Sequence, residues 1–135
     1  MADWVEGHVQ LSGKRSNLIQ FLLDGLIPLG NSIEIRNSKS KFEMLTPDSD
    51  YLIVDSDRHY LSCHNITMDH QKSQVIECQF SAAFEINTQL LESISKQFNI
   101  NIAIRANTPA DYVQKVNIIK GKVIQDDLIC SCDLA

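Results

Sequence analysis

The stretch Ile76–Ile86, IECQFSAAFEI, decides the fold, because apolar side chains occupy every second position along it. A period of two is typical of a β-strand that buries one face. The polar pair Asn87-Thr88 follows and can cap the start of a helix. The next apolar residues recur at helical spacing and are Leu90, Leu91, Ile94 and Phe98. This part of the chain therefore predicts a strand followed by an amphipathic helix.

The same order of strand and helix opens the chain. Residues 4–11 alternate between apolar and polar side chains, which predicts a half-buried strand. A helical stripe follows and consists of Leu18, Phe21, Leu22 and Leu26. We expect Ser12 or Ser16 to cap this helix, and Gly25 with Pro28 to end it.

The remaining β-prone segments pair naturally as hairpins or follow a helix. They are Ser32–Arg36 with Lys41–Leu45, Tyr51–Val54 with Tyr60–Ile66, Asn99–Ala106 after the second helix, and Val113–Ile119 with Lys122–Ile129. The last pair flanks Lys120-Gly121, and glycine suits the second central position of a two-residue turn.

These elements predict one α+β domain over residues 1–135, with an irregular insertion around residues 30–72. We expect a mostly antiparallel sheet with two helices packed on one face. The two β-α-β passages further predict a ferredoxin-like core with extra strands.

Composition and charge narrow the class of protein. The chain has 135 residues, of which 44% are hydrophobic and 21% charged, so it can bury a core. It contains no apolar run long enough to span a membrane and does not begin like a secretory signal, so we expect a cytoplasmic protein with reduced cysteines. The net charge of −5 argues against direct binding of nucleic acid.

Several of these segments are similar to one known family. The opening Trp4–Gly13, WVEGHVQLSG, resembles the start of the YubB/Api92-like ferredoxin-fold proteins, and the order from Phe80 through Lys120-Gly121 resembles their second half. The similarity covers the chain outside residues 30–72. Proteins of this family occur on phages, plasmids and other mobile elements and have no established activity. The resemblance therefore implies a mobile-element context and supplies no catalytic residue.

Histidines and cysteines gather in one segment and at the C-terminal end. The first group contains His59, Cys63, His64 and His70, and the second contains Cys130 and Cys132. Only one residue separates Cys130 from Cys132, and the chain has no second cysteine pair with zinc-site spacing. His59 and Cys63 would share one face of a strand, whereas His64 would face the other side. We therefore predict no metal, no cofactor and no catalytic residue. A small metal-binding protein or enzyme that uses the His59–His70 segment remains an alternative.

Negative charge is concentrated in one window. Residues 43–57 contain no Lys or Arg and carry the five acids Glu43, Asp48, Asp50, Asp55 and Asp57, so the rest of the chain sums to zero. Such a stripe can attract a basic surface and accelerate encounter, although acids also provide solubility and protect edge strands.

This charge distribution leads to a hypothesis about function. We expect a non-enzymatic accessory protein of a phage or other mobile element, which binds a basic protein partner through these five acids. That partner would be a host nucleic-acid-binding protein or defence nuclease, inhibited as anti-CRISPR and anti-restriction proteins inhibit theirs. A structural homo-oligomer, paired through an exposed strand edge, is a further alternative, and a homodimer stays open.

Overall fold

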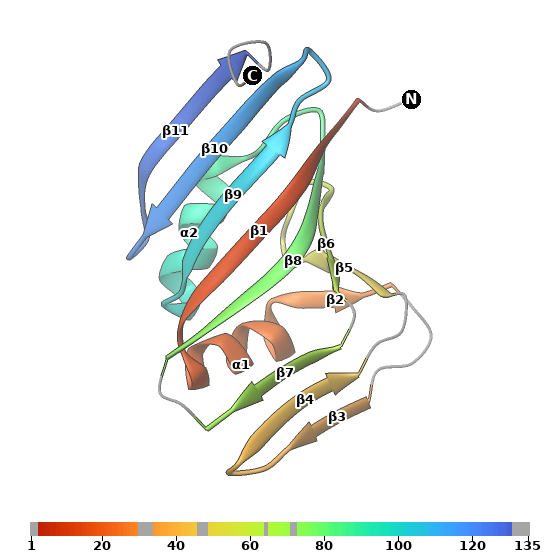
Figure 1. Ribbon diagram of the computed structural model, residues 1–135, viewed down its shortest axis with the longest axis vertical. Helices are drawn as coiled ribbons and strands as arrows, with labels where there is room; N and C mark the ends of the chain where they lie inside the picture. Colours follow the sequence, from red (N-terminus) through yellow and green to blue (C-terminus); the bar gives the residue numbers. More distant parts are fainter. Residues whose placement is uncertain (1–2, 30–33, 46–48, 64, 71–72, 131–135) are drawn as a thin grey trace.

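The chain forms two antiparallel sheets and two helices. The computed structural model describes residues 3–29, 34–45, 49–63, 65–70 and 73–130. Figure 1 labels the helices α1 (Arg15–Asp24) and α2 (Thr88–Phe98) and the strands β1 (Trp4–Lys14), β2 (Leu26–Pro28), β3 (Glu34–Asn37), β4 (Lys41–Leu45), β5 (Ser49–Ile53), β6 (His59–Cys63), β7 (Ile66–Asp69), β8 (Ser73–Ala83), β9 (Asn101–Asn107), β10 (Tyr112–Ile119) and β11 (Lys122–Cys130).

The strand order defines a large and a small sheet. The large sheet runs β11-β10-β9-β1-β8-β6-β5-β2, and the small sheet runs β3-β4-β7. Every pairing between the described strands is antiparallel. The predicted α+β class and the mostly antiparallel sheet are therefore confirmed, and the sheets are much larger than a four-stranded core.

Strand β1 lies in the middle of the large sheet because its alternation is matched on both sides. It pairs with β8 over its whole length, from Trp4 opposite Ala83 to Lys14 opposite Ser73. On its other side it pairs with β9, with Leu11 opposite Ile102. The two segments with the clearest period of two thus become the longest strands and direct one apolar face toward the core.

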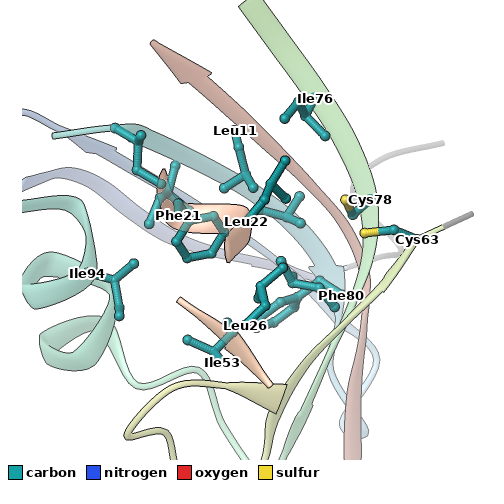
Figure 2. Close-up of a cluster of buried hydrophobic side chains, with 14 of the residues drawn as sticks. Leu11, Phe21, Leu22, Leu26, Ile53, Cys63, Ile76, Cys78, Phe80 and Ile94 are labelled. Carbon is teal, nitrogen blue, oxygen red and sulfur yellow. The ribbon is translucent and has the colours of Figure 1, made fainter. Parts of the chain in front are cut away.

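One cluster of buried side chains joins both sheets and both helices. Helix α1 contacts β1 and β8, helix α2 contacts β9, β10 and β11, and the helices meet where the rings of Phe21 and Phe98 lie 5.4 Å apart. Figure 2 shows Phe21, Leu22 and Ile94 among the side chains that converge on the sheet. Phe42 of β4 and Met68 of β7 belong to the same cluster, so the small sheet packs on the same core.

The region expected to be an irregular insertion is largely regular where the structure describes it. The two predicted hairpins form, as β3 with β4 and β5 with β6. The expected strand Tyr60–Ile66 is wrong in one respect, because it divides into β6 of the large sheet and β7 of the small sheet. The insertion therefore both extends the large sheet and builds the small one.

The ends of helix α1 differ from the prediction in two respects. Strand β1 continues to Lys14, so Ser12 lies in the strand and Ser16 inside α1, and neither caps the helix. Gly25 ends α1 as predicted, but Leu26 begins β2 instead of continuing the helical stripe. In α2 the prediction is confirmed, because the Asn87 side chain accepts a hydrogen bond from the Leu90 amide.

The β10–β11 turn confirms the expected use of glycine. Lys120 and Gly121 both have positive φ, 52° and 76°, as a type I′ turn requires. The turn is attached to α2 by Ser95, which is fully buried. The Ser95 hydroxyl donates to the Ile100 carbonyl at 2.6 Å and accepts from the Gly121 amide at 2.9 Å.

Replacing Ser95 with alanine is expected to lower the free energy of unfolding by about 2 kcal/mol, because two buried backbone groups lose their partner. Urea denaturation of the wild type and the variant measures this change. The matched control is Ser93→Ala on the exposed side of α2, whose hydroxyl bonds only to Gln89 within the helix. Equal losses in the two variants would show that Ser95 has no special role.

Candidate functional site

A groove of about 970 Å³ lies between the start of α2, the turn after β8, and strands β10 and β11. Three large apolar side chains on its rim are exposed, namely Phe84 (62%), Leu128 (58%) and Tyr112 (38%). Three carboxylates line it as well, from Asp57, Glu85 and Asp126. None of its described lining residues is Lys or Arg. We call these six residues and the hollow between them the acidic groove.

The nearest cation in the sequence is turned away to another partner. The guanidinium of Arg58, the neighbour of Asp57, lies 5.2 Å from the centre of the Trp4 ring, a cation–π distance. Within the part of the chain that the structure describes, no ion pair involves Asp57, Glu85 or Asp126.

Phe84 departs from the position that its sequence pattern predicts. The alternation of Ile76–Ile86 places Phe84 on the buried face, but β8 ends at Ala83 and the Phe84 ring is exposed. Its φ is +72°, a conformation that costs about 1–3 kcal/mol for a bulky residue. The Phe84 amide donates to the Asp3 carbonyl at 2.6 Å, and the Glu85 amide to the Ala83 carbonyl at 2.9 Å. These bonds hold the backbone in its strained form and present the ring to solvent.

His59 connects two walls of the groove. It is 2% exposed, and its ring meets Phe80 edge to face. The Asn87 amide donates to Nε2 at 2.9 Å, so the ring proton is on Nδ1, which donates to the Asp57 carbonyl at 2.7 Å. Both ring nitrogens are therefore engaged with backbone, and His59 fixes the β5–β6 turn against the start of α2.

Replacing His59 with phenylalanine is expected to cost about 2 kcal/mol of unfolding free energy, because the Asn87 amide and the Asp57 carbonyl lose their partner. Chemical denaturation measures the loss. The matched control is His8→Phe, since His8 is exposed on β1. A loss at His59 no larger than that at His8 would contradict the bridging role.

The four described acids of the predicted stripe are not brought together. Glu43 lies on β4 of the small sheet and pairs with Lys41 at 2.9 Å. Asp50 lies on β5 opposite Ser62, on the face away from the buried Tyr51. Asp55 and Asp57 belong to the β5–β6 turn, and of these Asp57 lines the groove. Asp48 falls outside the described residues.

The described acids of residues 43–57 therefore do not form a single stripe, and Asp57 is the only one of them that lines the acidic groove. The charge window spans two sheets, and alternation along β5 sends Asp50 to a different face from the groove. The other groove carboxylates, Glu85 and Asp126, come from distant parts of the chain. Only the adjacent acids Asp126-Asp127 give a signal in the sequence, and nothing there links them to Phe84.

The described histidines and cysteines of the His59–His70 segment are not arranged as the ligands of a metal ion. Within the described residues no three of His, Cys, Asp or Glu lie close enough to hold a metal ion, and His64 lies outside them. Cys63 and Cys78 are both buried and reduced. A hydrogen bond with Cys78, burial, and the nearby negative groups raise the pKa of the Cys63 thiol far above its usual range. Cys63 therefore stays protonated at neutral pH.

Comparison with known proteins finds no match for this chain among family models, curated proteins or solved structures. In the described part of the chain neither helix has the length and apolar character needed to cross a membrane.

Proposed function

We propose that this chain is a non-enzymatic binding protein whose acidic groove takes an apolar, basic segment of a partner protein. One observation carries the proposal: Phe84 stands exposed on a strained backbone at the rim of a groove lined by carboxylates and by no described cation. Strained backbone and exposed aromatic rings both cost stability, and both cluster at sites of interaction.

The groove offers the two contributions that protein recognition uses. Aromatic side chains that become buried supply most of the binding energy at interfaces, and Phe84 and Tyr112 are available for this. Carboxylates without an ion-pair partner attract Lys and Arg from a distance and disfavour acidic competitors; among those of the groove, Asp126 accepts one hydrogen bond, from the Gln114 side chain at 2.9 Å. A partner segment with apolar side chains between basic ones would satisfy both.

A host protein that handles nucleic acid is the partner class we propose, because such proteins display Lys and Arg for phosphate groups. The chain would act in the cytoplasm as an accessory protein of a phage or other mobile element and would inhibit that host protein or defence nuclease. The partner would bind at the acidic groove, through Asp57, Glu85 and Asp126, and not along residues 43–57.

We also propose a ferredoxin-like core and the kinship with YubB/Api92-like proteins. The strand order β9-β1-β8-β6 supports this, with α1 following β1 and α2 following β8. It is the order in which two β-α-β passages interlock in a ferredoxin-like sheet. The remaining strands would then be additions at both edges.

A homo-oligomer is the second candidate, and one observation favours it. Strand β11 is an edge of the large sheet, is nine residues long without proline, and exposes Ile124 by 62%. Such an edge can pair with a second copy, although the charges of Asp126 and Asp127 oppose this. Light scattering separates a dimer from a monomer.

Selection from a displayed library of random peptides tests the groove directly. We expect the peptides enriched on the wild type to combine apolar residues with Lys or Arg, and their capture to weaken as salt rises. The variant Glu85→Lys/Asp126→Lys should lose them. Asp24→Lys at the end of α1 is the control for a charge change elsewhere, and should retain them. Enrichment of acidic peptides on the wild type would contradict the proposal. So would capture of the selected peptides by Glu85→Lys/Asp126→Lys that equals their capture by Asp24→Lys.

A further inference from the structure

Cys63 and Cys78 face each other across two neighbouring strands. In the antiparallel ladder of β6 and β8, Ser62 lies opposite Gln79, so the next pair in this register is Cys63 and Cys78. Both side chains are 5% exposed, and they are hydrogen-bonded to each other. Figure 2 shows the two sulfur atoms side by side at the margin of the apolar cluster.

The backbone already meets the requirement for a covalent bridge. Residues directly opposite in antiparallel strands have Cα atoms about 4.5 or 5.5 Å apart. Disulfides span Cα separations of about 4.4–6.8 Å, so either value lies within their range. A bond between the two sulfur atoms would therefore require rotation of the side chains and no movement of the strands.

We propose that Cys63 and Cys78 are a modification site at which a small-molecule disulfide oxidises the protein. One cysteine attacks a sulfur of the small disulfide, forms a mixed disulfide and releases the first small thiol. The second cysteine then attacks the protein sulfur of that bond and releases the second small thiol. Two protein thiols are oxidised, and one small disulfide is reduced to two thiols.

The bridge would enclose β7. Strand β7 lies between the two cysteines in the sequence and pairs with β4 in the small sheet. Closing this loop covalently would fasten the small sheet to the large one and restrict the unfolded chain. Since both thiols are buried and the pKa of Cys63 is raised, the reaction requires local opening at the end of β6 and is expected to be slow.

The site is separate from the acidic groove. Cys78 lies five residues before Ala83, which lines the groove, and this is about 17 Å along a strand. Oxidation is therefore expected to leave peptide capture by the groove unchanged. The two proposals consequently fail independently: loss of the bridge says nothing against the groove, and the absence of selected peptides says nothing against the bridge.

Incubation of the full chain with oxidised glutathione tests the proposal. Peptide mapping by mass spectrometry is expected to find a Cys63–Cys78 disulfide, and the melting temperature of the oxidised protein should rise by about 10 °C. The variants Cys63→Ala and Cys78→Ala should each lose this rise while Cys130→Ser keeps it. Cys130 is half-exposed and reports that the reagent is active.

If Cys130 becomes glutathionylated while Cys63 and Cys78 remain thiols or carry one glutathione each, the proposal is wrong. Should either alanine variant fail to fold, the mapping and the melting temperature of the wild-type chain before and after reduction still decide the matter. A bridge that maps to Cys63 and Cys78 but lowers the melting temperature would contradict the claim that it forms without strand movement.

Discussion

Replacing Phe84 with glycine is expected to stabilise the fold by about 1 kcal/mol and to weaken capture of a groove-selected peptide about 30-fold. The stability should rise because glycine adopts positive φ without strain, while the exposed ring contributes little burial. The affinity should fall because the aromatic anchor is gone. Urea denaturation and isothermal titration with the same peptide measure the two effects.

Alanine at the same position separates the two causes. Phe84→Ala removes the ring and keeps the strained backbone, so it should lose affinity as glycine does without the gain in stability. A Phe84→Gly variant that is less stable than Phe84→Ala would show that the backbone of this turn is not strained. Wild-type affinity in both variants would show that the ring is not the anchor.

Gly7→Ala is expected to cost about 3 kcal/mol of unfolding free energy, which would be a large part of the stability of a domain of this size. Gly7 lies on β1 opposite Ala106 of β9. An added Cβ would lie 2.5 Å from the Ala106 Cα and also meet the Arg105 backbone, so the two central strands would have to separate.

Ser12→Ala on the same strand is the control for this prediction, because Ser12 is half-exposed and its substitution should change stability by less than about 0.5 kcal/mol. Both variants can be compared by urea denaturation at one temperature. A Gly7→Ala protein as stable as Ser12→Ala would mean that β1 and β9 do not approach as closely as the structure has them.

Local patterns predicted much of the fold. The alternation in residues 4–11 and 76–86 predicted the two longest strands, Asn87 predicted a helix cap, and Lys120-Gly121 predicted a turn. Each depends on neighbouring residues alone. The errors at Ser12 and Leu26 arose where pairing with a distant strand extended β1 or formed β2, which no local pattern reports.

The candidate site was harder to predict for the same reason. Phe84 continues an apolar alternation, so the sequence does not report the turn at this residue. The turn is defined by the positive φ of Phe84 and by the hydrogen bonds of the Phe84 and Glu85 amides to Asp3 and Ala83. The groove is lined by the β5–β6 turn, the β8–α2 turn and strand β11. These segments are far apart in the sequence, and the order of the strands in the large sheet brings them together. Charge in residues 43–57 was visible in the sequence, but its distribution over two sheets was not.

The most direct measurement is a two-dimensional NMR titration of the ¹⁵N-labelled protein with the most strongly enriched peptide. The groove account predicts that amide shifts concentrate at Phe84, Thr88, Tyr112 and Leu128, and that the peptide carries Lys or Arg beside apolar residues. Shifts confined to the far face of the sheet, around Gln79 and Arg105, would contradict it.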